Sequence, residues 1–189
     1  MCRTGYVPFI GNWRSNLLCQ VHGRVLEVGA GSGPNLDHYP PDAASVIATE
    51  FNEESIAQAK SRSNVRRAGE RIRLASADIE HLAFPDDTFD AAVATLVFCS
   101  VERPVVGFRE VRRVLKPGGR LYLIDHVRSH HAWLGRLQDR LNPRWHAFAE
   151  GCNLNRDTEG NVRAAGFELL NLKINFLGLI KTMVAVKFL

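Results

Sequence analysis

Cysteine is scarce in this 189-residue chain, and its four cysteines are scattered over the sequence at Cys2, Cys19, Cys99 and Cys152. No two of them form a CxxC pair, so the spacing predicts neither a zinc site nor a disulfide framework, and we expect no bound metal. A reducing, cytoplasmic setting fits this use of cysteine best.

Long apolar runs are also missing. The longest mainly apolar run, residues 91–101, is about half of the ~20 residues that a helix needs to span a bilayer. The N-terminus does not show the charged-then-apolar profile of a signal peptide. We therefore expect no transmembrane segment.

Charge of one sign is not in large excess, since 24 basic residues against 20 acidic residues leave a net charge of +4. Residues 103–144 nevertheless hold ten basic and three acidic residues. This stretch is either the solvated face of a helix, or it meets an acidic substrate headgroup or an anionic membrane surface as a peripheral contact. Its centre is a run of basic residues on one predicted helix: Arg109, Arg112, Arg113 and Lys116.

Length and composition predict a single α/β domain over residues 1–189, since a domain takes ~150 residues. Short apolar runs alternate with helical patterns, and this alternation is typical of a parallel sheet with crossover helices. The expected strands are residues 25–28, 45–49, 72–75, 89–97 and 120–124, followed after a short helix over 157–165 by 167–174 and 183–188.

Two segments stand apart from this alternation. Residues 126–156 lack clean periodicity, and we expect them to lie over one end of the sheet as a substrate-cover insertion. Residues 1–22 form an N-terminal segment, and the sequence leaves open whether this segment closes over a ligand as a lid. Among the helices, Asn52 is expected to cap one, and Pro117-Gly118-Gly119 is expected to end another.

The first predicted strand leads into a glycine-rich turn, residues 27–35, with the sequence EVGAGSGPN. Its glycines allow a ligand to approach the backbone closely, although such a pattern alone is also compatible with a turn that binds nothing. A helix is expected to follow this turn. Glu50 ends the next strand, where a carboxylate can hydrogen-bond the two hydroxyls of a ribose. Pro34 stands where a nicotinamide-binding GxGxxG loop has its last glycine, so the loop departs from that pattern.

An acid, Glu27, followed by GxGxG resembles the first motif of the class I S-adenosylmethionine-dependent methyltransferases. Asp78-Ile79, Phe89-Asp90 and the run LKPGG at residues 115–119 match further motifs of that family. The resemblance implies a Rossmann-like fold: a seven-stranded, mostly parallel sheet with an antiparallel last strand and helices on both faces. It also implies S-adenosylmethionine as cofactor and S-adenosylhomocysteine as product.

The same resemblance assigns a set of cofactor-binding residues. The glycine turn would hold the methionine part, Glu50 the ribose and Asp78 the adenine, with Phe51 and Ile79 packing on the purine. The full set is Glu27, Gly29, Ala30, Gly31, Gly33, Asn35, Glu50, Phe51, Asp78, Ile79 and Leu96.

The resemblance narrows further in four segments, which look like the methyltransferase-like 7 group: residues 95–101, 126–127, 143–145 and 151–154. The members of this group are thiol S-methyltransferases related to the ubiquinone-biosynthesis type. This implies transfer of a methyl group to a small-molecule acceptor, a thiol, by direct in-line displacement. A phospholipid or quinone-precursor methyltransferase is the alternative. A cofactor-binding protein without catalysis is a second alternative.

At the acceptor end, His126 follows the fifth predicted strand and is our candidate base, the alternative being a histidine that bonds a loop carbonyl. Trp145 and His146 lie in the cover and are candidate substrate contacts, or else they pack the cover on the domain. Cys152 is interpreted as a pocket or packing residue. The (Asp/Asn)-Pro-Pro-aromatic motif of base methylation is absent from the end of the fourth strand, so we expect no nucleic-acid substrate. The sequence does not predict an oligomeric state.

Overall fold

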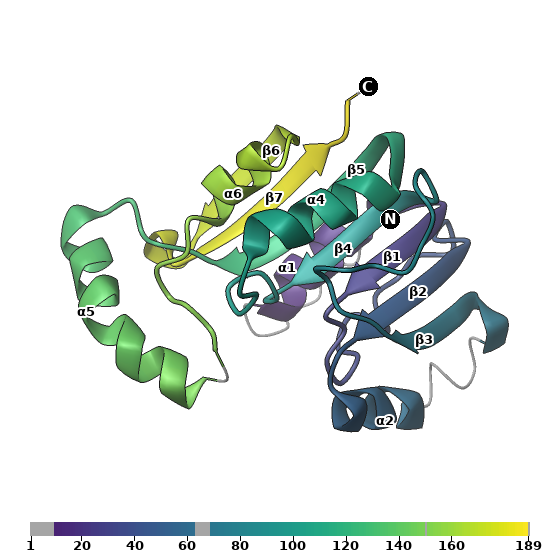
Figure 1. Ribbon diagram of the computed structural model, residues 1–189, viewed down its shortest axis with the longest axis horizontal. Coiled ribbons are helices and arrows are strands. Elements are labelled where there is room, and N and C mark those ends of the chain that lie inside the picture. The colour runs from purple at the N-terminus through teal and green to yellow at the C-terminus, as the bar shows by residue number, and fades with distance from the viewer. Residues whose placement is uncertain (1–9, 63–68, 150, 189) are drawn as a thin grey trace.

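The computed structural model describes residues 10–62, 69–149 and 151–188. Its centre is a seven-stranded sheet of order β3-β2-β1-β4-β5-β7-β6 (Figure 1). Strands β1 to β5 pair in parallel, whereas β7 runs antiparallel to both of its neighbours. The sheet therefore has the predicted mostly parallel form with an antiparallel last strand. The strands are β1 Arg24–Val28, β2 Ser45–Glu50, β3 Ile72–Ser76, β4 Phe89–Thr95, β5 Leu115–His126, β6 Glu168–Asn175 and β7 Ile180–Val186.

Helices cover both faces of this sheet. One buried core lies between the sheet and α1 and α2, and a second lies between the sheet and α4 and α6. Figure 1 shows α4 and α6 in front of the strands, with α1 behind them, while α5 stands beyond the end of the sheet. The helices are α1 Ile10–Leu18, α2 Glu53–Ser61, α4 Pro104–Val114, α5 Ala132–Phe148 and α6 Thr158–Ala164, with short 3-10 helices η1 Gly69–Arg71 and η2 Phe176–Gly178.

The start of α2 follows the sequence prediction. The Asn52 side chain accepts a hydrogen bond of 2.9 Å from the backbone N–H of Ser55, which satisfies one of the free donors of the first turn. Glu53 and Glu54 lie in that turn and Lys60 in the last, so each charge matches the helix dipole.

Two predicted elements differ in the structure. No helix follows the glycine turn, because Pro34 and its neighbours form successive tight turns, with backbone bonds from Leu36 to Gly33 and from His38 to Asn35. Strand β5 begins at Leu115, well before residue 120, and a register shift opposite β4 accommodates the Pro-Gly-Gly run.

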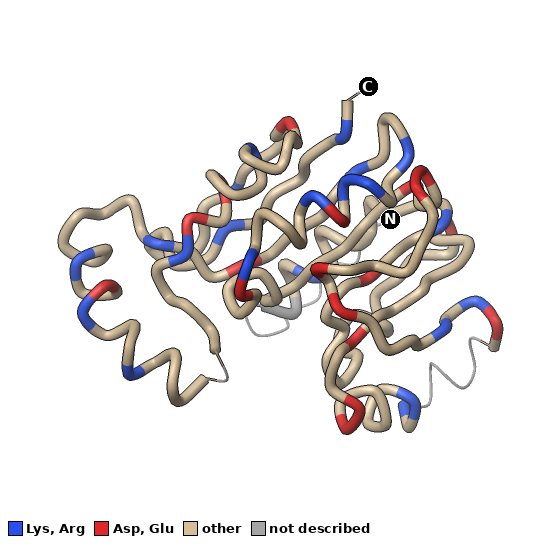
Figure 2. Tube along the Cα trace, in the orientation of Figure 1, with Lys and Arg blue, Asp and Glu red and all other residues tan. Residues whose placement is uncertain are grey.

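Basic residues gather along α4 and at its end (Figure 2), and three of them bond to other parts of the chain. Arg112 donates to the carbonyl oxygens of Gly166 and Phe188, and Lys116 pairs with Asp90 at 2.6 Å. Arg113 pairs with both Glu110 and Asp86. These three side chains therefore contribute to the fold, and the contact of this stretch with an acidic headgroup or an anionic surface stays a prediction.

Two further observations concern the cellular setting. Within the described residues, no helix has the length and apolarity needed to cross a bilayer. Cys19, directly after α1, is disulfide-bonded, although the spacing of the cysteines predicted no disulfide framework. The cytoplasmic location rested in part on that prediction and stays a prediction.

Candidate active site

A cavity of about 750 Å³ opens at the carboxyl edge of the parallel strands. Its walls come from the segments that follow β1, β2, β3 and β4, and from the end of β5. Residues from α5 and the segment after it close the far side. Ligands of open α/β sheets bind at this edge, so the topology places the cavity where a cofactor is expected.

The glycine turn forms one wall of the cavity. Gly29 and Gly31 both have positive φ angles, of 63° and 54°, a region that side chains other than glycine enter at a cost. A Cβ on Gly29 would lie 2.5 Å from a methyl carbon of Val97, whereas a Cβ on Gly31 would meet nothing within 4 Å. Gly29 is therefore required by packing, and Gly31 leaves open space on the cavity wall.

Glu50 fixes this turn from the end of β2. One carboxylate oxygen accepts a bond of 2.8 Å from the N–H of Gly31, and the other accepts bonds from the N–H groups of Phe51 and Asn52 at 2.8 and 3.0 Å. A carboxylate offers about four acceptor positions, so this one can still accept bonds from a ligand in the cavity. Glu50 thus holds the wall and also lines it.

Beneath the turn lies a buried polar network around Glu27. Its carboxylate accepts bonds from Asn35 at 3.0 Å and from the Tyr39 hydroxyl at 2.8 Å. Burial raises the pKa of Glu27 to about 7, although these two donors and the nearby Arg14 favour the charged form. Asn35 also donates to Thr95, and its own carbonyl oxygen is buried with no hydrogen-bond partner in the part of the chain that the structure describes. Asn35 as a residue also lines the cavity.

The segment after β3 forms the opposite rim. Asp78 accepts a bond of 2.8 Å from the N–H of Glu80, and this bond is the main reason that the pKa of Asp78 is lowered. Ile79 lines the cavity beside it, and Phe51 lies across the rim with 78% of its surface exposed. An exposed aromatic ring and an aliphatic side chain at one mouth offer two apolar faces to a flat ligand.

The end of β4 is held in an unusual conformation. Leu96 has φ +59°, and its N–H donates to the Ile124 carbonyl at 2.7 Å. A left-handed leucine costs on the order of 1 kcal/mol or more, and such costs persist where the surrounding structure enforces them at a functional site. The conformation turns the chain into the loop that carries Cys99.

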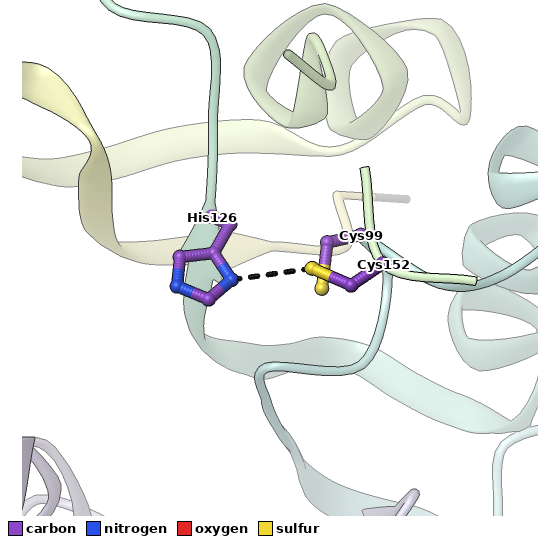
Figure 3. Close-up of side chains that lie close together, drawn as sticks. All are labelled: Cys99, His126 and Cys152. Atoms are coloured by element: carbon purple, nitrogen blue, oxygen red, sulfur yellow. Dashed lines mark hydrogen bonds between the residues drawn. The ribbon is translucent and has the colours of Figure 1, made fainter. Parts of the chain in front are cut away.

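Three side chains from separate elements meet at the other end of the cavity (Figure 3): Cys99 after β4, His126 at the end of β5, and Cys152 after α5. Their ligand atoms all lie within 4.8 Å of one another, and the Cys152 sulfur lies 3.4 Å from His126 Nδ1. The hydrogen bond between the two thiols raises the pKa of Cys99 and lowers that of Cys152, and the bond to Cys152 raises the pKa of His126.

The backbone around this cluster is tightly bonded. The buried Asp125 carboxylate accepts bonds from the N–H of Cys99 at 3.2 Å and from the Thr158 hydroxyl at 2.9 Å. The carbonyl of Cys99 accepts bonds from the backbone and side chain of Asn153, both at 2.9 Å, and from Arg156 at 3.3 Å. These bonds join the loops that carry the two cysteines.

The structure brings most of the predicted site residues to one cavity. The lining includes Gly29, Ala30, Gly31, Asn35, Glu50, Phe51, Asp78, Ile79, Leu96, His126 and Trp145. Glu27 is buried beneath the wall, Gly33 packs against Leu36, and His146 lies outside the lining.

Arg14 on α1 is a lining residue that sequence reasoning missed. Its Nε is buried and has no hydrogen-bond partner in the described part of the chain, and burial lowers the pKa of Arg14. A single arginine that belongs to no sequence motif gives no local signal of a binding role. Only the folding of α1 against the sheet reveals it, and it shows that the N-terminal segment contributes to the cavity wall.

The methyltransferase domain family matches residues 26–123, which is more than half of the chain. The chain belongs to this family. The match covers the glycine turn, Glu50, Asp78 and the end of β4, and the resemblance to class I S-adenosylmethionine-dependent methyltransferases is confirmed. The family implies S-adenosylmethionine as its cofactor.

Individual relatives agree with the narrower resemblance. The chain is 36% identical to human thiol S-methyltransferase TMT1A over 151 residues, which are 79% of this chain and 62% of that protein. It is 29% identical to the ubiquinone/menaquinone biosynthesis C-methyltransferase UbiE of Azotobacter vinelandii over 119 residues, 61% of this chain and 47% of that protein. The chain thus spans about three fifths of the thiol S-methyltransferase relatives that it matches.

A solved structure shows the same fold. The YcgJ protein of Bacillus subtilis superposes with a TM-score of 0.75 at 18% identity, covering 93% of this chain and 98% of that one. The predicted fold class, with its antiparallel last strand and helices on both faces, is therefore confirmed.

Proposed function

We propose that the chain is an S-adenosylmethionine-dependent methyltransferase that methylates a small thiol by direct displacement. The observation that carries this proposal is the two-ended cavity. One end has the glycine turn, Glu50 and Asp78, and the other has two cysteines and His126. The similarity to thiol S-methyltransferases supports the choice of acceptor.

The residues of the first end fit the cofactor. The open space at Gly31 leaves room for the methionine part, and the carbonyl oxygen of Asn35, which has no partner among the described residues, suits its ammonium group. The Arg14 guanidinium, with a buried Nε that lacks a partner among the described residues, suits its carboxylate. Glu50 would accept from the ribose hydroxyls and Asp78 from the adenine amino group, with Phe51 and Ile79 on the two apolar faces at the rim.

When bound, S-adenosylmethionine supplies a methyl group on a sulfonium sulfur, which is already activated for displacement. The chain then has to position the acceptor, exclude water and keep the acceptor sulfur as a thiolate. A free thiol has a reference pKa near 8.5, so this needs only modest help. His126 lies at the acceptor end with Cys152 at 3.4 Å, and we assign it the role of taking the acceptor proton. Trp145 lines the same end and is the proposed substrate contact.

A second acceptor class has one specific observation in its favour. A mainly apolar cavity of about 290 Å³ adjoins the first and shares His126 and Trp145 with it. Its walls include Leu137, Leu141 and Phe176. Such a cavity can take the apolar body of a quinol precursor as readily as that of a thiol, and UbiE is a relative of this chain.

Methyl transfer from labelled S-adenosylmethionine to a panel of acceptors tests the proposal. The panel holds an alkyl thiol, hydrogen sulfide, a quinol precursor and phosphatidylethanolamine, and cofactor binding is measured in parallel. We expect methylated thiol as the main product. Transfer to the quinol or lipid alone would overturn the acceptor, and tight cofactor binding without product from any acceptor would favour a non-catalytic cofactor-binding protein.

A further inference from the structure

The cluster of Cys99, His126 and Cys152 combines three side chains that are common ligands of one metal (Figure 3). The sequence predicted no metal site, because these residues are far apart in the chain and belong to no ligand motif. The fold brings them together. We propose that this cluster binds one Zn²⁺ ion and that the fourth position of the ion faces the acceptor end of the cavity.

The distances suit a zinc ion. Tetrahedral zinc with Zn–S near 2.3 Å and Zn–N near 2.0 Å places its ligand atoms about 3.5 to 3.8 Å apart. The Cys152 sulfur and His126 Nδ1 are 3.4 Å apart, and all three ligand atoms lie within 4.8 Å of one another. Changes of up to about one ångström in the separations of the ligand atoms are therefore enough to complete the site.

The surroundings of the cluster resemble those of a built site. Metal ligands are held by supporting hydrogen bonds that fix their orientation. Here Asp125 and Asn153 bond the backbone on either side of the Cys99 side chain, and Cys152 N–H donates to the Ala149 carbonyl at 2.9 Å. His126 is paired with Ile180 in the sheet. The cysteines are buried and reduced, so their sulfur atoms are available to a metal.

Three protein ligands leave one position free, which is the arrangement of catalytic rather than structural zinc sites. All three ligands line the main cavity, so this position faces the space where we place the acceptor. An acceptor thiol that takes the position loses its proton to solvent and binds as a thiolate, in place of water. This role rests on the proposed function. In the zinc-loaded chain His126 is a ligand of the ion, and coordination of the acceptor sulfur replaces the proton transfer to His126 that we propose for the metal-free site.

Zinc binding is measured on the full chain, reduced and freed of metal by a chelator, by titration with Zn²⁺ against a chromophoric competitor. We expect one equivalent per chain. Co²⁺ in its place should give a tetrahedral spectrum with sulfur-to-cobalt charge transfer, which reports thiolate ligands directly.

Variants assign the ligands. Cys99→Ser, Cys152→Ser and His126→Gln should each weaken Zn²⁺ binding about a hundredfold or more, beyond the 10–100-fold that loss of a supporting contact costs. His131→Gln, a change at an exposed histidine outside the cavity, is the matched control and should leave the affinity unchanged. Cofactor binding like that of the parent chain shows that a variant is folded.

Several results would overturn the zinc site. The first is that the reduced chain takes up no Zn²⁺, and the second is that the three ligand variants bind Zn²⁺ as tightly as the parent chain. The third is that mild oxidation forms a Cys99–Cys152 disulfide in a chain that takes up no metal. The thiol assay separates this inference from the proposed function. Equal thiol methylation with and without zinc removes the zinc role alone, whereas zinc uptake without thiol methylation by the loaded chain removes the proposed acceptor alone.

Discussion

Replacing Glu50 by alanine should weaken S-adenosylmethionine binding by about 1 to 3 kcal/mol, a 5- to 150-fold rise in Kd. The carboxylate accepts backbone bonds from Gly31, Phe51 and Asn52 and lines the cavity, where its remaining acceptor position would take a ribose hydroxyl. Charge-assisted bonds of this kind are worth more than neutral ones, and water replaces part of the loss.

Isothermal titration calorimetry measures the change directly. Glu50→Gln keeps one acceptor oxygen and removes the charge, so its Kd should fall between those of the parent chain and the alanine variant. Glu53→Ala is the matched control, because it removes the same charge from the exposed first turn of α2. An unchanged Kd for the alanine variant would remove Glu50 from the ribose site.

Four further predictions follow from the same geometry. Burial raises the pKa of Glu27 from its reference of 4.5 to about 7, so the folded state binds this proton more tightly than the unfolded state does. The free energy of unfolding should therefore fall as pH rises from about 4.5 to 7. The loss is on the order of 3 kcal/mol at 1.36 kcal/mol per pKa unit, and denaturant melts at several pH values should show a flatter profile for Glu27→Gln. Gly29→Ala should destabilise the fold by about 2 to 4 kcal/mol, because the new methyl group clashes with Val97 and the residue has a positive φ. Gly31→Ala should cost only about 1 kcal/mol, because it meets no neighbour. Equal unfolding midpoints of the two variants in urea would contradict this. Arg14→Ala should weaken cofactor binding about tenfold or more in calorimetry, and a parent-like Kd would exclude the carboxylate contact. His126→Gln should lower the methyl-transfer rate and leave cofactor binding intact, and an unchanged rate would remove its catalytic role.

Local signals in the sequence predicted the core of the fold. The apolar runs became β1 to β4 within two residues of the predicted ends, since a buried parallel strand shows itself as a short run of aliphatic residues. Asn52 was predictable as a cap because capping depends on neighbours in the chain. The glycine turn and Glu50 were found because each lies at the end of a predicted strand, whereas Asp78 was assigned by the family resemblance.

Features that depend on distant segments were not predictable. β5 extends back to Leu115 because the last residues of the chain bond to it, with Lys187 N–H donating to the Gly119 carbonyl at 3.0 Å. Arg14 reaches the cavity only because α1 packs on the sheet. Cys99 and Cys152 come together through bonds between two loops that share no sequence pattern.

A crystal structure with S-adenosylhomocysteine tests the central claim most directly. We predict adenine beside Asp78, the ribose on Glu50 and the thioether sulfur directed toward the end formed by Cys99, His126 and Cys152. A product molecule bound in the reverse direction, or outside this cavity, would contradict the assignment of the two ends.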